Sequence, residues 1–448
     1  MNMEQKRSSG RKFGVFLGLA ALVMIAIQFV RPRLDTPPVT GDLTAPPEVK
    51  AILKRACYDC HSNETKLSWF DQPEPAYWLV ADHVKKGRAV LNFSTWDGLS
   101  KDQQKGKLFE SLNQMVYNVM PLKQYAWFHP GAAITPGDIT ILRNYLGTLV
   151  QPVKMPDSAR GPDVSGRPAL ADPSTTIKDA PNGLAYMPGW PGWEAISTTD
   201  RFDNGTMRVI YGNDVAVKAV KDHQTHPWPN GTTFAKVAWE QALAADGKVQ
   251  PGKFLQAEFM VKDAEKYKTT DGWGWGRWKG TELKPYGKNA LFTTECMNCH
   301  KPMEDNDFVF TTPLNPADAA LPDPADFNPL EWKVITSAIN KGEGSMSTLY
   351  GNELAVSAAR AGGDGHKPYP AGAVLAWVTW LQQEDRHWFG ANIPGAIRSI
   401  EKVTFINPSN APGREASYES YIGMPLRKIV EKDPVAVRER VTYITNLR

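Results

Sequence analysis

Cys296-Met297-Asn298-Cys299-His300 is the stretch of this 448-residue chain around which the remaining sequence is organised. A similar stretch, Cys57-Tyr58-Asp59-Cys60-His61, stands upstream, and the two together contain all 4 cysteines. In a C-x-x-C-H motif the thiols are spaced to bond the two vinyl groups of one haem, and the histidine binds the iron. A redox dithiol, a zinc half-site or a disulfide does not explain a histidine directly after each cysteine pair. We therefore predict two covalently bound c-type haems, with His61 and His300 as iron ligands.

Composition narrows the classes of protein to consider. The chain has 51 basic and 48 acidic residues, a formal net charge of +3, and no basic block beyond the extreme N-terminus. This balance gives no reason to expect a nucleic acid as partner. With 42% hydrophobic residues and 15 tryptophans, the chain is long enough for about three packed domains.

The N-terminus predicts attachment to a membrane. Four basic residues between positions 6 and 12 precede an apolar run over residues 13–30 that is broken only by Gln28. A run of about 18 residues is just long enough to cross a bilayer. The far flank, Arg31-Pro32-Arg33, has no small-residue cleavage site, which favours an uncleaved signal anchor over a removed signal peptide. Residues 1–33 are therefore predicted as a cytoplasmic tip and a single-pass anchor in a bacterial inner membrane. The remaining domains would lie in the periplasm, where c-type haem is attached.

Helical patterns surround the first haem motif. After a spacer over residues 34–47 that is rich in Pro, Thr and Asp, apolar residues at helical spacing lead to Cys57. Thr135-Pro136 is a capping residue followed by proline at the first helical position. These signals predict an all-helical, cytochrome c-like domain over residues 48–150. A linker over residues 151–184, rich in Pro, Asp, Ser and Gly, would follow it.

Several motifs of this first domain carry a family resemblance. They include Cys57-Tyr-Asp-Cys-His-Ser-Asn-Glu-Thr65, Tyr77-Trp-Leu-Val80, Leu91-Asn-Phe-Ser94 and Met120-Pro121-Leu122. In this order they resemble the c-type haem-binding domain family of exported bacterial proteins. Met120 looks like the methionine ligand of class I cytochromes c and is the predicted sixth ligand of the first iron. His83 is the alternative ligand, a buried core methionine is the structural alternative for Met120, and His129 is predicted as a loop residue.

The region 185–316 has a different pattern. Strand signals at residues 207–211, 232–239, 254–261 and 272–278, with a helix at 214–220, predict an antiparallel sheet with few helices. Most haem pockets are helical, so a β-rich one restricts the choice of family.

Five separated segments carry a resemblance in this region. They are Arg208-Val-Ile-Tyr-Gly-Asn-Asp-Val-Ala-Val-Lys218, Trp228-Pro-Asn-Gly231, Phe234-Ala-Lys-Val-Ala-Trp239, Gly272-Trp-Gly-Trp275, and the second haem motif followed by Asp307-Phe-Val-Phe310. In this order they resemble cytochrome P-460, a family of periplasmic c-haem enzymes that oxidise hydroxylamine and crosslink their haem to a lysine. The resemblance implies a product of nitrous oxide or nitric oxide. The beta-type cytochromes c-prime share the fold, lack the crosslink and bind small gases.

The identity of the crosslinking lysine decides the expected chemistry. Alternation in the predicted strand places Lys236 between apolar neighbours on one face. Lys236 is the predicted crosslinking and catalytic residue, and Lys218 is an alternative for this role. The alternative without a functional role is that Lys236 is an ordinary solvated lysine. The protons that leave the substrate need a base on the distal side. Glu258, Glu240 and Asp214 are candidates, although the sequence does not place any of them over the iron and each could be a solvated carboxylate.

An internal repeat accounts for the C-terminal third. Met207-Arg-Val-Ile-Tyr-Gly-Asn-Asp-Val-Ala-Val217 recurs as Met346-Ser-Thr-Leu-Tyr-Gly-Asn-Glu-Leu-Ala-Val356, and Ala235-Lys-Val-Ala-Trp239 recurs as Ala376-Trp-Val-Thr-Trp380. Residues 317–448 are therefore predicted as a degenerate second copy, haem-free because it contains no cysteine. Trp377 replaces Lys236 and is predicted to fill the place of the macrocycle, with packing at an interface as the alternative. We further predict that the two copies pack as a pseudo-dimer.

Together these patterns predict an α+β multidomain fold. It would contain an N-terminal transmembrane anchor, an all-α cytochrome c-like domain and two antiparallel β-rich, cytochrome P-460-like domains. The expected partners are a small nitrogenous substrate such as hydroxylamine or nitric oxide, a periplasmic redox partner and the membrane. The expected function is hydroxylamine oxidation at the second, lysine-crosslinked haem, with electrons passed to the first. The alternatives are a nitric oxide- or carbon monoxide-binding protein and a simple electron-transfer cytochrome.

Overall fold

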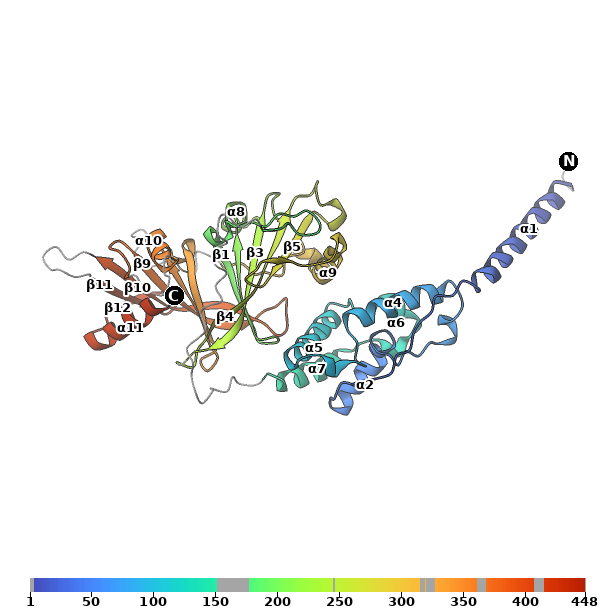
Figure 1. Cartoon of the computed structure of the whole chain (residues 1–448), viewed down its shortest axis with the longest axis horizontal. Helices are drawn as coiled ribbons and strands as arrows, with labels where there is room; N and C mark the ends of the chain where they lie inside the picture. Colours follow the sequence, from blue (N-terminus) through green and yellow to red (C-terminus); the bar gives the residue numbers. More distant parts are fainter. Residues whose placement is uncertain are drawn as a thin grey trace. The chain divides into compact units, whose positions relative to one another are not determined.

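The computed structural model describes residues 4–150, 177–244, 246–314, 319, 327–360, 368–406 and 415–447. The chain divides into two compact units, Met1–Leu149 and Val150–Arg448 (Figure 1). Most of the predicted linker, residues 151–176, and the predicted domain boundary at residues 316 and 317 lie outside the described residues.

The first unit is helical, as predicted. Its α-helices are α1 (Glu4–Ile27), α2 (Pro47–Ala56), α3 (Tyr58–His61), α4 (Ala76–Val90), α5 (Lys101–Val116), α6 (Lys123–Phe128) and α7 (Pro136–Thr148), with 3-10 turns at Trp69–Asp71, Trp96–Gly98 and Pro130–Ala132. The predicted cap of α7 is present, because the Thr135 side chain accepts a hydrogen bond from the backbone N–H of Asp138 and the Asp138 carboxylate accepts one from that of Thr135. The core includes Leu53, Phe93, Phe109, Leu112 and Leu146.

Helix α1 covers most of the predicted anchor. In the part of the chain that the structure describes, no helix combines the length and hydrophobicity needed to cross a membrane. The anchor therefore stays a prediction.

Residues 34–47, predicted as a spacer, pack against the helices instead. Leu43 is buried, and the Tyr58 hydroxyl donates a 2.6 Å hydrogen bond to the Asp42 carboxylate. Charge and apolar contacts fix this segment to the domain, a feature that its composition did not predict.

The second unit is built on one antiparallel sheet, into which 12 strands join among the described residues. They are β1 (Glu194–Arg201), β2 (Thr206–Gly212), β3 (Thr233–Leu243), β4 (Val249–Lys262), β5 (Trp273–Lys279), β6 (Lys284–Pro285), β7 (Lys333–Asn340), β8 (Ser345–Gly351), β9 (Val374–Glu384), β10 (Asn392–Ile406), β11 (Glu415–Ile422) and β12 (Arg427–Ile429). The helices are α8 (Asp214–Lys221), α9 (Thr293–His300), α10 (Glu353–Arg360) and α11 (Pro434–Asn446), and 3-10 turns lie at Trp190–Gly192, Lys268–Thr270, Ala290–Phe292, Lys301–Asn306 and Pro329–Glu331. The α+β description holds for the two units together.

The strand order shows the repeat directly. Strands β1 to β6 pair in sequence order to form a first copy, and β7 to β12 repeat the same pairings as a second copy. Val249 of β4 pairs with Ile339 of β7, and Asp200 of β1 pairs with Asn392 of β10. Each copy thus places the start of its fourth strand against the end of the other copy's first strand, which is the arrangement of a two-fold dimer.

A shared core lies between the copies. One buried cluster contains Ala235 and Val237 of β3 together with Ala376, Val378 and Trp380 of β9. The prediction that this face of both strands serves a common core, and that the two copies pack together, is confirmed.

The opposite face differs between the copies. Trp377 stands opposite Leu349 as Lys236 stands opposite Ile210, so the two residues occupy equivalent positions. Trp377 is buried beneath α11, with its ring centroid 6.2 Å from that of Tyr443. The interface alternative for Trp377 is therefore wrong, because α11 of the same copy covers it.

Candidate haem sites

One face of the first copy carries a row of side chains in register. Ile210 of β2 stands opposite Lys236 of β3, which stands opposite Glu258 of β4, which stands opposite Arg277 of β5. Directly opposite residues in antiparallel strands have Cβ atoms about 4.5–5.5 Å apart, so charged members of such a row interact.

Glu258 is bound from both sides. It forms ion pairs with Lys236 and with Arg277, whose Nε lies 2.8 Å from Oε1, and it accepts a 2.5 Å hydrogen bond from Gln256. Burial alone would raise the pKa of the Glu258 carboxyl, but the neighbouring charges of Lys236 and Arg277 lower it to about 2. Glu258 is therefore an ionised, largely buried carboxylate, which sequence reasoning did not place.

The other candidates lie elsewhere. Lys218 is 76% exposed on α8 and pairs with Asp222, and both Glu240 and Asp214 face solvent. Of the two candidate lysines, Lys236 is the one that stands opposite a carboxylate. Burial lowers the pKa of its amine, and the negative charge of Glu258 acts in the opposite direction. Among the residues predicted around the lysine, the structure therefore brings together Lys236 and Glu258.

Arg208 adds another partly buried cation to this face. It precedes Ile210 by two residues on β2 and so lies on the same side of the sheet. Burial, together with the charge of Arg201, lowers the pKa of its guanidinium to about 9. Its Nε is buried and has no hydrogen-bond partner among the residues that the structure describes. Such an atom fits a site that receives a polar ligand. The alternation that singled out Lys236 could also have identified Arg208 and Arg277.

Helix α9 carries the second haem motif and packs on the same face. Cys296 contacts the apolar cluster that contains Phe234 and Trp275, and the ring centroid of His300 lies 4.4 Å from that of Trp275. His300 Nδ1 donates to the Phe308 carbonyl at 2.7 Å, which leaves Nε2 to bind iron. Burial lowers the pKa of His300 to about 4, so the imidazole is neutral at physiological pH.

A strained turn aims the Phe308 carbonyl at His300. Asp307 and Phe308 both have positive φ, 48° and 65°, which non-glycine residues rarely adopt. The Asp307 carboxylate holds the turn, because it accepts hydrogen bonds from Lys262 Nζ at 2.6 Å and from the Trp228 backbone at 2.9 Å. In the second copy Phe405 stands at the position of Lys262. The backbone shows the equivalence, because the N–H of Gly231 donates to the Lys262 carbonyl and the N–H of the equivalent Gly372 donates to the Phe405 carbonyl.

The first haem motif lies between α2 and α4. His61 Nδ1 is 3.1 Å from the carbonyl oxygens of both Gly87 and Leu91, so its Nε2 is likewise left for iron. Helix α4 therefore lies on the Nδ1 side of the ring, opposite the Nε2 that would hold an iron. This placement disfavours His83 of α4 as the sixth ligand, and Met120, half-buried after α5, stays the predicted one.

His129 has no ring nitrogen left for a metal. Its Nδ1 donates to the Tyr125 carbonyl at 3.0 Å, and its Nε2 pairs with Asp71 at 3.0 Å. It ends α6 and stabilises the loop that follows, which agrees with its prediction as a loop residue.

Both motifs fit a covalent haem. Each offers two cysteines without a disulfide and a partly buried imidazole whose Nδ1 is already bonded. Such sites on a helical domain and on an antiparallel sheet define a haem cytochrome.

Comparison with protein families agrees with this class. Residues 22–148 match the Haem-binding domain family, and residues 187–311 and 324–405 match Cytochrome P460. The helical unit therefore matches the haem-binding domain family and both copies of the sheet unit match the cytochrome P460 family, as the resemblances predicted. The second P460 match ends before α11. A search of curated proteins found no match.

Proposed function

We propose that this protein is a membrane-anchored, periplasmic dihaem c-type cytochrome that oxidises hydroxylamine at the first P460 copy. The observation that carries the proposal is the ionised carboxylate of Glu258, held between Lys236 and Arg277 on the face where α9 packs. A simple electron carrier has no need of a partly buried row of charged residues beside its cofactor.

Protons must leave as the substrate is oxidised. Oxidation of hydroxylamine to nitrous oxide or nitric oxide releases as many protons as electrons. A haem iron held by His300 would supply the electron-accepting centre. Glu258 is the base on this face, and Arg208 would donate a hydrogen bond to the substrate oxygen from its buried Nε.

The predicted crosslink would make Glu258 a better base. Bonding of Lys236 to the macrocycle would replace an N–H and a C–H bond by a C–N bond. That step would remove two electrons and two protons and would need an oxidant of the peroxide class. The product amine is uncharged, so Glu258 would lose its strand lysine as a cation partner. Loss of that charge would raise the pKa of Glu258, with Arg277 and Arg208 as the cations that still lower it, and a carboxylate of higher pKa is a better general base.

The first haem would accept the electrons. We propose that it passes them to a periplasmic redox partner, with the unit held at the membrane by the predicted anchor. Covalent haem attachment outside the cytoplasm supports this location.

Hydroxylamine-dependent reduction of the first haem tests the proposal. Wild-type protein should show this reduction and a strongly red-shifted ferrous Soret band, and Lys236→Leu should lose both. Lys218→Leu, which changes an exposed lysine of the same copy, is the matched control. Activity that survives in Lys236→Leu would remove Lys236 from the mechanism. An ordinary c-haem spectrum that responds to nitric oxide would instead indicate a gas-binding protein.

A further inference from the structure

The hairpins that join the two copies differ in length. The β3–β4 connection of the first copy spans residues 244–248, whereas the equivalent β9–β10 connection, residues 385–391, is two residues longer. The longer loop is closed internally, because the Asp385 N–H donates to the Ala391 carbonyl at 2.9 Å. It carries His387 and Trp388, and it belongs to the copy without cysteine.

The side chains of His387 and Trp388 both contact the segment that follows α9, the helix that carries the second haem motif. His387 Nδ1 donates to the Phe310 carbonyl at 2.7 Å, and the Trp388 ring meets the Phe310 ring edge-on with centroids 5.8 Å apart. The Phe310 ring in turn lies 5.1 Å from the ring of His300. One phenylalanine therefore separates the second copy from the candidate iron ligand.

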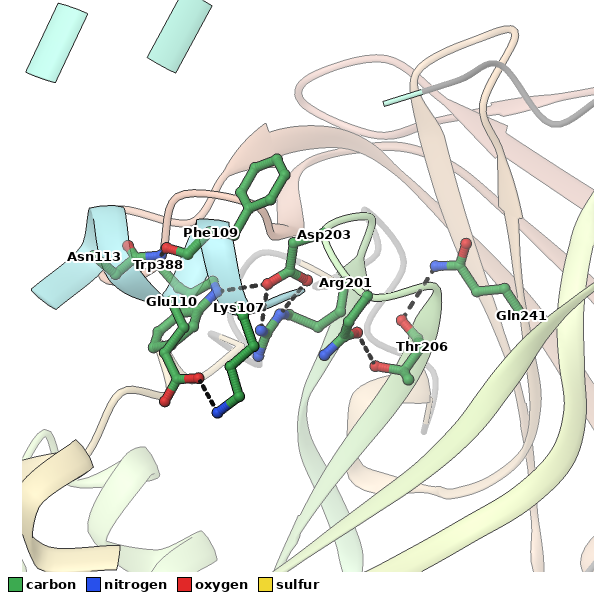
Figure 2. Close-up of polar contacts among 10 residues, drawn as sticks. Lys107, Phe109, Glu110, Asn113, Arg201, Asp203, Thr206, Gln241 and Trp388 are labelled. Atoms are coloured by element: carbon green, nitrogen blue, oxygen red, sulfur yellow. Dashed lines mark hydrogen bonds and ion pairs between the residues drawn. The ribbon is translucent and has the colours of Figure 1, made fainter. Parts of the chain in front are cut away.

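Trp388 is fixed by a buried ion pair of the first copy (Figure 2). Asp203 is fully buried and accepts hydrogen bonds from Arg201 at 2.8 and 2.5 Å. Trp388 Nε1 donates to the same carboxylate at 2.9 Å, and the Arg201 guanidinium lies 4.5 Å from the indole. A fully bonded network of this kind specifies one side-chain position. The indole is thus a rigid support for Phe310.

We propose that the second copy positions the proximal ligand of the haem in the first copy, through His387 and Trp388 acting on Phe310. Phe310 belongs to the same segment as Phe308, whose carbonyl accepts the hydrogen bond from His300. Movement of this segment changes both the packing of the imidazole and its Nδ1 hydrogen bond, and these contacts set the orientation and basicity of a metal-bound histidine. His387 and Trp388 are positioning residues, because neither touches the iron ligand itself.

The inference rests on the proposal that His300 holds a haem iron, but it does not depend on the substrate. The test uses the full-length haem protein and the iron–histidine stretching band of its ferrous form, measured by resonance Raman spectroscopy, with the midpoint potential as a second readout. Trp388→Ala and His387→Ala should shift or broaden the band and shift the potential. His387→Asn, which keeps a donor near Nδ1, should restore both.

The equivalent hairpin of the first copy, the β3–β4 connection, supplies a matched control. Lys248 of the shorter hairpin donates to the Tyr443 hydroxyl of α11 at 2.8 Å, so it joins the copies away from Phe310. Lys248→Ala should lower the thermal unfolding temperature and leave the band in place. The inference is overturned if Trp388→Ala and His387→Ala leave the band unchanged, or if Lys248→Ala shifts it equally. If Trp388→Ala does not fold, Trp388→Phe, which keeps a ring against Phe310 but loses the bond to Asp203, takes its place. A haem count of one per chain in the wild type would instead refute the proposed function.

Discussion

Glu258 and Glu401 occupy equivalent positions in the two copies, and each is bound by cations, but the cations come from different elements. Glu258 stands opposite Lys236 and pairs with it, whereas Glu401 stands opposite Trp377 and accepts hydrogen bonds from Arg440 of α11 at 2.8 and 2.5 Å. The carboxylate is common to both copies, and what surrounds it has changed. In the second copy α11 and the Trp377 indole cover this face of the sheet. In the first copy Lys236 and the haem motif of α9 lie on it.

Glu258→Gln should abolish most hydroxylamine oxidation. The amide keeps the shape of the side chain but accepts no proton, and loss of a general base lowers rates by about 100- to 10,000-fold. Steady-state hydroxylamine oxidation at saturating acceptor measures this effect. Glu240→Gln, an exposed change on the neighbouring strand β3, should leave the rate unaltered. Equal rates in the two variants would remove Glu258 from the reaction.

Acid should lower the free energy of unfolding by protonating Glu258, as long as a cation stands opposite this residue. Lys236→Arg keeps a charge and cannot form the lysine crosslink. The folded-state pKa of Glu258, about 2, lies below its usual value of 4.5, so the ionised carboxylate stabilises the fold above pH 4.5. That contribution is lost as the pH falls from about 4.5 toward 2. Chemical denaturation across this range should show the loss in Lys236→Arg and a flatter dependence in Lys236→Arg/Glu258→Gln. If the free energies of unfolding of the two variants fall equally with pH, Glu258 is not the group that causes the loss.

Arg440→Ala should destabilise the second copy without affecting the haem. Glu401 is 8% exposed, and among the described residues the Tyr418 hydroxyl is the side-chain donor that it keeps in this variant. Loss of hydrogen bonds to a buried charge is worth about 1–3 kcal/mol. Denaturant unfolding gives the free energy, and the optical spectrum serves as the haem readout. Arg438→Ala, an exposed change on the same helix, is the control and should unfold like the wild type.

Local patterns in the sequence predicted most of the elements and both haem motifs. Strand β3, helix α8 and the cap of α7 depend on neighbouring residues, so their signals are visible without knowledge of the fold. The repeat also predicted that Lys236 and Trp377 occupy one position, because an alignment of the copies needs no coordinates.

The partner of Lys236 could not be predicted in the same way. Counted from the β3–β4 turn, where Leu243 pairs with Val249, Lys236 would stand opposite Gln256. Irregular pairing around Trp239 shifts the register, so Glu258 takes that place instead. The covering of Trp377 by α11 was equally hidden, because α11 has no counterpart in the motifs that defined the repeat.

Lys262→Met should weaken the turn that holds the Phe308 carbonyl against His300. The variant leaves the Asp307 carboxylate buried without its ammonium partner, and breaking such a pair costs about 3–5 kcal/mol. We expect a lower unfolding temperature together with a shifted iron–histidine stretching band. Lys253→Met removes an exposed lysine from the same strand and should change neither. A lower unfolding temperature with an unshifted band would assign Lys262 a structural role only.

Gly87→Ala should disturb the first haem site, whereas Gly147→Ala should not. A Cβ atom at Gly87 would lie 2.7 Å from the backbone oxygen of Cys60, so α4 must move away from the haem motif. Overpacking of this kind costs about 1–3 kcal/mol, and the shift would also weaken the hydrogen bond from His61 to the Gly87 carbonyl. Gly147 of α7 has open space around it, where alanine stabilises a helix by about 0.5–1 kcal/mol. Thermal unfolding and the potential of the first haem measure both effects. Similar behaviour of the two variants would show that α4 is not tightly packed against the motif.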